Sequence, residues 1–385
     1  MINYRYDNYW LELVEDEEGS EILVYDNDRL IRRISLSEED RSPGKINIPL
    51  SNICNMKCLY CSEADYMNKE PQRIDMDFAF SVIAAYLKYT ERRSGPKKIQ
   101  LSFDYGGEPI CELESMEKIA GYFREECGKK GLIPVVQITT NGAWKPEMLP
   151  RVLKAADEII VSLDGYKKLH EKYRIHKKER PVFNRVFANA KNLYGLNRLK
   201  QISCVVTRDS AKNFEQLIDF FIAEFPGSTV RMNPVIFTGN AVKNDIKRIT
   251  VGEWKNFINK VTDKSRGRLD IIDCRPEKSI KTKYFYGCGY MDMTGWFAWL
   301  DGKVTCCTDR ELDDFVIGEF RDKGLIMNEE LMIKLHTENN VLNINTCESC
   351  IAKFYCAGGC PKFRNGLINC DRRKEKYVGM LIGKE

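Results

Sequence analysis

From about residue 46 onward, short apolar runs alternate with longer amphipathic stretches. For example, KINIPLS precedes DFAFSVIAAYLKYTERR, and KIQLSFDY precedes ESMEKIAGYFREECGKK. Strands that alternate with helices predict βαβ units and a parallel sheet. Six such strands can be counted before residue 250, fewer than the eight that close a barrel. We therefore predict an α/β fold built on a partial (β/α)6 TIM-like barrel.

The pattern changes on both sides of this region. Residues 1–45 contain strand-like pieces between acidic and Gly/Asp turns, which predict a small β-rich appendage. After residue 250 the alternation stops, and one helical segment leads into an irregular, Gly- and Cys-rich tail. The predicted domains are thus residues 1–45, the barrel at 46–250, and a linker helix with a loop-rich, Cys-rich domain at 251–385.

Four unusual stretches follow predicted strands of the barrel. CNMKCLYC comes after the first strand, GGEP after the second, TTNG ends the third and SLDG ends the fourth. Functional groups in such folds lie on loops after the carboxyl ends of the strands. The sequence therefore predicts one site at one rim of the barrel.

Cysteine is the unusual part of the composition. The chain has 15 cysteines, an odd number, and its N-terminus has no apolar segment typical of a signal peptide. In a reducing cytoplasm, which we predict as the location, clustered thiols bind metal more often than they form disulfides. Sixty Lys and Arg against 56 Asp and Glu give no reason to expect nucleic acid, and no apolar run of membrane-spanning length is present.

Cys54, Cys58 and Cys61 lie within eight residues on the first of these loops. Four thiolates saturate a [4Fe–4S] cluster or a tetrahedral zinc ion, so three leave one metal position open. An open position is what a catalytic metal centre requires. The alternatives are a zinc site with a distant fourth ligand and a set of buried thiols.

The C-x3-C-x2-C spacing, with Tyr60 before the third cysteine, resembles the radical S-adenosylmethionine (SAM) superfamily. The resemblance implies that the three cysteines hold a [4Fe–4S] cluster whose fourth iron is chelated by the amine and carboxylate of SAM. It implies that Tyr60 lies near the adenine. Gly106, Gly107 and Glu108 match the family's GGEP motif, which binds the SAM amine. Taken alone, this motif could be an ordinary turn.

The resemblance also suggests further contacts to SAM. Ser162 and Asp164 stand where the family contacts the ribose and carboxylate, and Ser162 is the preferred candidate. Arg174 and Arg185 resemble basic positions that neutralise the SAM carboxylate, although either could be a solvated helix charge. Thr140 and Asn141 of TTNG can be read as only a strand end and a turn.

Seven cysteines of the tail resemble the SPASM pattern, an auxiliary-cluster domain of many radical SAM enzymes. The resemblance assigns four of them to an outer [4Fe–4S] cluster, namely Cys347, Cys350, Cys356 and Cys370. It assigns three to an inner cluster, namely Cys288, Cys307 and Cys360. The alternative is zinc, because CxxC pairs are also typical of zinc ribbons.

The fourth ligand of the inner cluster is left open. Some relatives have a cysteine five residues before the first ligand, where this chain has Thr282. Cys274 is the best candidate and Cys306 the next; without either, the cluster has an open iron. Asp309, two residues after Cys307, is a candidate proton acceptor, with a turn aspartate as the alternative.

The resemblance implies an enzyme that cleaves SAM reductively to a 5′-deoxyadenosyl radical. The radical abstracts a hydrogen from a ribosomally made peptide, and the product is an oxidative cross-link such as a thioether. The resemblance implies three [4Fe–4S] clusters: one that binds SAM and two auxiliary clusters that assist the oxidation. Expected partners are a peptide or protein substrate, a flavodoxin or ferredoxin as reductant, and a separate leader-binding protein. One alternative is an anaerobic sulfatase maturase that forms formylglycine; another is a non-catalytic iron–sulfur or zinc scaffold.

Overall fold

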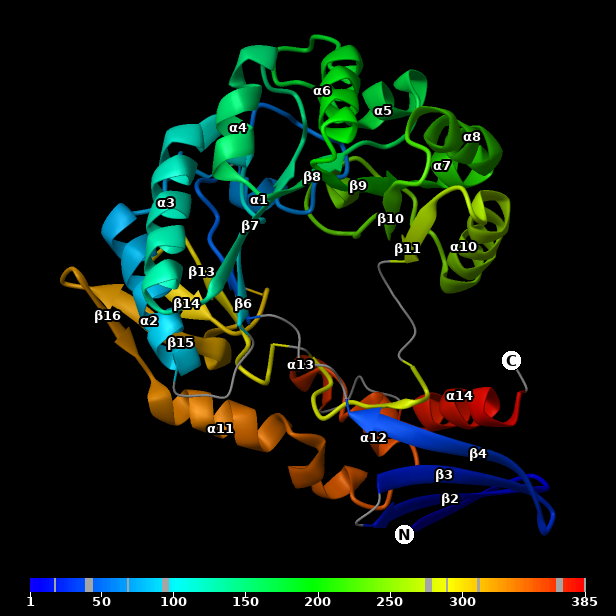
Figure 1. Ribbon diagram of the computed structural model, residues 1–385. Helices are drawn as coiled ribbons and strands as arrows, with labels where there is room; N and C mark the ends of the chain where they lie inside the picture. The colour runs from blue at the N-terminus through cyan, green and yellow to red at the C-terminus, as the bar shows by residue number, and fades with distance from the viewer. Residues whose placement is uncertain are drawn as a thin grey trace.

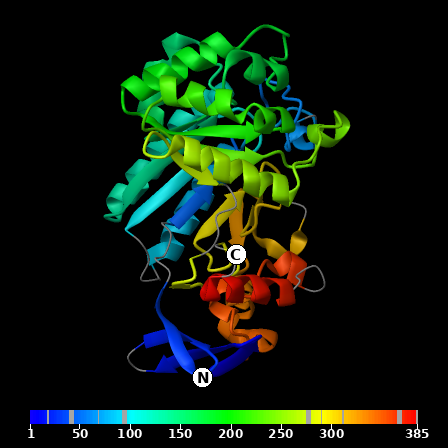
Figure 2. The ribbon, with the colours of Figure 1, turned by 90° about the vertical axis from the view of Figure 1, so that its right-hand side faces the viewer.

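The computed structural model describes residues 1–16, 19–38, 44–67, 69–91, 97–273, 279–288, 290–309, 312–364 and 370–383. A curled sheet with helices on its outer side forms the upper part of the molecule (Figure 1). A second, smaller sheet lies at the opposite end, near both termini (Figures 1 and 2). Among the described residues, no helix has the length and apolar character needed to cross a membrane.

The six strands predicted for the barrel are present and all parallel, which confirms the α/β half-barrel. They are β5 (Gly44–Asn47), β6 (Lys98–Phe103), β7 (Ile133–Thr140), β8 (Glu158–Ser162), β9 (Leu199–Val206) and β10 (Thr229–Pro234). A seventh parallel strand, β11 (Asp270–Asp273), pairs with β10. The alternation of strands and helices therefore continues beyond residue 250, where the sequence pattern placed its end.

Helices follow most of these strands and cover the outer face of the sheet (Figure 1). The helices of this region are α1 (Ala64–Met67), α2 (Met76–Glu91), α3 (Leu113–Lys129), α4 (Leu149–Ala155), α5 (Lys167–Tyr173), α6 (Phe183–Gly195), α7 (Arg208–Lys212), α8 (Phe214–Glu224), α9 (Asn240–Lys243) and α10 (Val251–Ser265). Short 3-10 turns are η1 (Pro109–Glu112), η2 (Pro146–Met148), η3 (Asp313–Phe315), η4 (Val341–Asn343) and η5 (Asn345–Cys347).

The two faces of the curled sheet differ in chemistry. Side chains alternate along a strand, and those on the outer face, such as Leu101 and Val136, are apolar and fully buried with the helices. Their neighbours face the lumen and are polar on most strands; they include Lys45, Asn47, Ser102, Gln137, Gln201, Ser203, Arg231 and Asn233. These polar side chains can form hydrogen bonds with a bound molecule, so the lumen is suited to binding a polar ligand.

The C-terminal region extends the barrel sheet. β13 (Gly295–Ala298) pairs in parallel with β5, and β14 (Lys303–Thr305), β15 (Val316–Arg321) and β16 (Gly324–Met327) follow as antiparallel neighbours. The remaining elements are β12 (Thr282–Lys283), α11 (Glu329–Asn339), α12 (Lys353–Cys356), α13 (Pro361–Arg364) and α14 (Cys370–Ile382). One continuous sheet thus connects the barrel to the Cys-rich tail.

The N-terminal sheet packs on the Cys-rich tail. It contains β1 (Ile2–Tyr6), β2 (Tyr9–Asp16), β3 (Gly19–Asp26) and β4 (Arg29–Glu38), all antiparallel, with β12 at its edge. Its apolar face forms a core with residues of the tail, among them Phe354 and Tyr377, and the partly buried Cys347 and Cys350 pack against this core. The predicted β-rich appendage therefore shares one hydrophobic core with the C-terminal tail.

We expect Leu11→Ala to lower the free energy of unfolding of the N-terminal sheet and tail by about 2–5 kcal/mol, since Leu11 is fully buried and the substitution leaves a cavity. Leu30→Ala, at a site 42% exposed on the same sheet, should change it by less than about 0.5 kcal/mol. Urea unfolding, monitored by near-UV circular dichroism, measures the free energy of unfolding of both variants. Equal losses for the two variants would contradict the shared core.

Candidate functional site

The loop with the cysteine triplet is held by backbone contacts from the GGEP loop. The amide of Gly107 donates to the carbonyl of Ser51 at 2.7 Å, and the amide of Glu108 donates to the carbonyl of Ile53 at 2.8 Å. A Cβ on Gly107 would lie 2.0 Å from the Ile53 carbonyl oxygen, so only glycine fits. In the structure, the glycines of GGEP thus allow the backbone of the cysteine loop to approach closely.

Cys54, Cys58 and Cys61 are partly buried and unpaired. Burial raises the pKa of all three thiols, that of Cys58 to about 12. Within the part of the chain that the structure describes, no three Cys, His, Asp or Glu side chains already form a closed ligand set. Three thiols on one turn nevertheless fit the donor set of an iron–sulfur cluster, which they would bind with release of their protons.

Glu108 lies buried beside the triplet, with three hydrogen bonds to its carboxylate. It accepts from the Thr140 hydroxyl at 2.5 Å, the Asn141 amide at 2.7 Å and the Ile110 amide at 3.2 Å. Burial raises the pKa of Glu108 to about 7, although these donors oppose the shift. A carboxylate with this pKa changes charge near neutral pH.

TTNG is more than a strand end. Thr140 and Asn141 hold Glu108. The side-chain amide of Asn141 donates to the side-chain Oδ1 of Asn55 at 2.7 Å and lies 3.9 Å from the Cys54 sulfur. Three loops, after β5, β6 and β7, therefore meet at the triplet. The sequence placed TTNG on the correct rim, but its side-chain contacts could not be read from the pattern.

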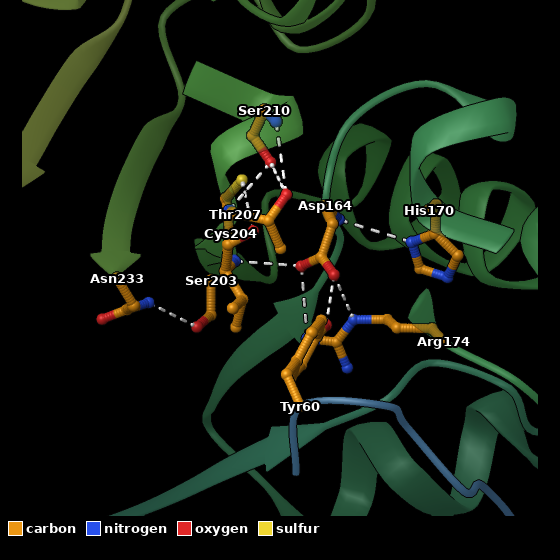
Figure 3. Close-up of polar contacts among 10 residues, drawn as sticks. Tyr60, Asp164, His170, Arg174, Ser203, Cys204, Thr207, Ser210 and Asn233 are labelled. Carbon is orange, nitrogen blue, oxygen red and sulfur yellow. Dashed lines mark hydrogen bonds and ion pairs between the residues drawn. The ribbon is translucent and has the colours of Figure 1, made fainter. Parts of the chain in front are cut away.

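Asp164 is the centre of a second buried network (Figure 3). Arg174 donates to both of its carboxylate oxygens, at 3.0 and 3.3 Å, and the Tyr60 hydroxyl donates to it as well. The Asp164 amide donates to His170 Nδ1 at 3.3 Å, and burial lowers the pKa of His170 to about 4, so the ring stays a neutral acceptor. Arg174, predicted as a SAM contact or a solvated charge, is a buried ion-pair partner.

The Arg174 guanidinium also lies over the Tyr60 ring, 5.5 Å from its centroid. This contact and the hydrogen bond to Asp164 fix the aromatic residue that precedes Cys61. Ser162 ends β8 in the same region and is half-buried. Tyr60 and Ser162 are therefore both placed at the rim, and their contacts to SAM remain predictions.

Arg185 lies in a different environment. It is exposed on α6 and lines a cavity of about 260 Å³, together with Glu108, Asn141, Lys145 and Arg180. The lining of this cavity thus combines one carboxylate with three cationic side chains. Arg180 is a candidate that the sequence did not single out, because it stands in a charged stretch, KKER, that reads as a solvated surface.

The thiols of the tail influence one another electrostatically in two sets. Burial and the charges of Cys307 and Cys360 raise the pKa of Cys288, which indicates that these three lie close together. In the same way, burial and the charges of the three other outer cysteines raise the pKa of Cys347. These sets have the same members as the predicted inner and outer sets. Their metal ligation stays a prediction, since no three Cys, His, Asp or Glu side chains among the described residues are arranged to hold a metal.

The fourth inner ligand is still open. Cys306 is fully buried within the barrel core, with its sulfur 4.0 Å from the Phe315 carbonyl oxygen, and burial raises its pKa to about 12. Cys274 lies outside the described residues. Asp309 donates its amide to the Cys307 sulfur at 3.4 Å and forms an ion pair with Lys362, so its proton-acceptor role stays a prediction.

Comparison with known proteins identifies the class. Residues 48–221 match the family model of the radical SAM superfamily, a range that includes the triplet, GGEP, TTNG and SLDG. The chain therefore contains a radical SAM domain and is an enzyme, which confirms the resemblance seen in the sequence.

Its relatives include anaerobic sulfatase-maturating enzymes. The chain is 24% identical over 371 residues to the cysteine-type enzyme of Clostridium novyi, covering 86% of this chain and 94% of the relative. It is 22% identical over 356 residues to the serine-type enzyme of Klebsiella aerogenes, covering 88% and 85%.

Two solved structures have a similar fold. One is anSMEcpe with bound AdoMet, with a TM-score of 0.62, 19% identity, and coverage of 89% of this chain and 99% of that one. The other is SuiB of Streptococcus suis, with a TM-score of 0.56, 19% identity, and coverage of 83% and 73%. Because the match extends beyond residues 48–221, the fold of the C-terminal region is also shared.

Asp164→Asn should lower the free energy of unfolding by about 3–5 kcal/mol, because it leaves the Arg174 cation buried without its counter-charge. The two side chains are only 2% and 8% exposed. Glu114→Gln breaks an exposed ion pair with Lys118 and should cost less than about 1 kcal/mol. Denaturant titration of the reconstituted protein measures both, and a cost below 1 kcal/mol for Asp164→Asn would show that the pair is replaceable.

Proposed function

We propose that this chain is a peptide-modifying radical SAM enzyme whose triplet, Cys54, Cys58 and Cys61, holds the catalytic [4Fe–4S] cluster. The observation that carries the proposal is the loop of three thiols joined to the GGEP loop within a radical SAM domain. When bound and reduced, this cluster and SAM supply a 5′-deoxyadenosyl radical that abstracts a hydrogen from the substrate. The protein's part is to bind, orient and enclose the reactants.

The residues at the rim suit the polar groups of SAM. Glu108 offers a carboxylate for the amine, since a carboxylate can accept more hydrogen bonds than the three it has. Arg185 lines the cavity beside Glu108 and is the better candidate for the SAM carboxylate, because Arg174 is engaged with Asp164. Tyr60 presents a fixed ring for the adenine, and Ser162 a hydroxyl for the ribose.

A peptide substrate is supported by the structural neighbours. Structures of anSMEcpe contain bound AdoMet and a peptide named Cp18Cys, and a SuiB structure contains the precursor peptide SuiA. The polar lumen of this chain offers hydrogen-bonding groups for such a chain of amides. The product we propose first is an oxidative cross-link such as a thioether.

Formylglycine formation is the second candidate. It is favoured by the sulfatase-maturating enzymes among the relatives, which match along more than four fifths of this chain. The two products differ in mass and in sulfur content, because formylglycine replaces a cysteine thiol by an aldehyde whereas a thioether keeps the sulfur. Mass spectrometry of a cysteine-containing peptide after anaerobic reaction distinguishes them.

Two auxiliary [4Fe–4S] clusters complete the proposal. The outer one would use Cys347, Cys350, Cys356 and Cys370, and the inner one Cys288, Cys307 and Cys360, with Asp309 as a nearby proton acceptor. Held by these cysteines, the inner cluster would supply an acceptor for the electron left after hydrogen abstraction, so that the net reaction would be oxidative. A flavodoxin or ferredoxin would supply the first electron, and a separate protein could bind the peptide leader.

Replacing Cys54, Cys58 and Cys61 together by Ala should abolish 5′-deoxyadenosine formation from SAM and dithionite, because no iron then remains to bind the nucleotide. The tail should keep its iron, since its cysteines are on another part of the chain. Iron analysis and chromatography of the nucleoside products measure both. Undiminished 5′-deoxyadenosine, or zinc in place of iron at the triplet of wild type, would contradict the proposal.

SAM binding should weaken as the pH falls below about 7, because Glu108, whose pKa is raised to about 7, is then protonated and cannot pair with the ammonium group. The dissociation constant should rise by up to about tenfold per pH unit. Glu108→Gln should bind SAM weakly at every pH, whereas Glu112→Gln, which removes a carboxylate paired with Arg73, should behave as wild type. Equilibrium dialysis under anaerobic conditions measures this, and a pH-independent wild type would contradict the role of Glu108.

A further inference from the structure

The lumen contains one ion pair that is complete in itself. Lys45 Nζ lies 3.3 Å from Asp104 Oδ2, which also accepts from the Ser102 hydroxyl at 2.6 Å and from Gln137 Nε2 at 3.3 Å. These side chains come from β5, β6 and β7. Because Asp104 already has a cation and two neutral donors, the charge of Lys45 is matched within the protein.

Arg231 is a second cationic side chain in the lumen, and it has no carboxylate partner among the described residues. It stands on β10, in register with Ser203 of β9, on the face opposite the buried Val230 and Met232. Its side chain is exposed, and it makes no ion pair among the described residues. The described part of the lumen therefore has a net positive charge at Arg231.

Two tyrosines are close enough to Arg231 to be influenced by its charge. Tyr105 and Tyr290 pack edge-on against the same ring, Phe297, at centroid distances of 5.7 and 5.0 Å. Burial raises the pKa of both phenols and Asp104 raises it further, whereas Arg231 lowers it. The guanidinium is thus within electrostatic reach of both hydroxyl groups.

This group of side chains lies between the two predicted cluster sites. Tyr105 precedes the GGEP loop and is also influenced by the charge of Glu63, two residues after Cys61. Tyr290 follows Cys288 by two residues and is influenced by its charge.

We propose that Arg231, with the hydroxyl groups of Tyr105 and Tyr290, forms a subsite that binds a carboxylate of the peptide substrate, and this rests on the proposed peptide-modifying function. A guanidinium presents two parallel N–H donors that match both oxygens of a carboxylate. Two phenols add neutral donors without adding charge. One cation with neutral donors suits a monoanion, so the specified group is an Asp or Glu side chain or the peptide's C-terminus.

The test uses the full-length, anaerobically reconstituted protein with SAM and fluorescently labelled cysteine-containing peptides. In a scan, one position at a time carries Glu, Gln or Lys, and the C-terminus is either free or amidated. At one position, or at the C-terminus, the carboxylate should bind about tenfold more tightly than the matched amide, a typical effect of a charge-assisted hydrogen bond. Fluorescence anisotropy measures binding without requiring turnover.

Arg231→Gln should remove this preference, and Arg231→Glu should reverse it in favour of Lys at the same position. The control is Arg266→Gln, which changes an arginine 81% exposed on the outer surface and should keep the wild-type preference. Arg231 is exposed, so we expect both variants to fold, and their iron content and circular dichroism check this.

The proposal is overturned if wild type binds acid and amide peptides equally, or if Arg231→Gln keeps the preference. The same samples are assayed for 5′-deoxyadenosine and for peptide modification. Modified peptides without any carboxylate preference would reject the subsite and leave the proposed function standing. Failure of wild type to bind any peptide or to cleave SAM would reject both.

Discussion

The close contact between the backbones of the GGEP loop and the cysteine loop is the constraint on which the site depends. Gly107 must lack a side chain for its amide to reach the Ser51 carbonyl, and this position brings the Glu108 carboxylate beside Cys54. Glu108 in turn fixes Thr140 and Asn141 of the next loop. A larger residue at position 107 would therefore disturb the thiols, the carboxylate and the third loop together.

Much of the fold follows from the sequence because the outer face of the half-barrel is buried by helices and must be apolar. That requirement produces the runs from which β5–β10 were predicted. β11 was missed because it has only four residues, two of them Asp270 and Asp273, and its pairing with β10 depends on tertiary contacts. The N-terminal strands were also predicted, but their packing on the tail connects segments more than 300 residues apart and has no local signal.

The cysteine and loop motifs predicted which loops come together at the site, but not which contacts the neighbouring arginine side chains make. The pattern cannot distinguish an arginine that faces solvent from one buried against a carboxylate, and Arg174 is ten residues from Asp164 with a helix between them. For the same reason Arg180 and Arg231, each in an unremarkable local sequence, were not selected. Their significance comes from the cavity and the lumen that the fold creates around them.

The pairing of β13 with β5 fixes the relation between the two predicted cluster sites. Because these strands are parallel, the triplet follows β5 at one end of the barrel, whereas Cys288 precedes β13 at the other. β14 runs antiparallel and returns the chain to that second end, where Cys307 follows it. The polar lumen, with its cation at Arg231, lies between the two ends. A substrate held there, as we propose, would have the triplet at one end of the strands and Cys288 and Cys307 at the other, so the pairing of β13 with β5 sets the separation of the two predicted sites.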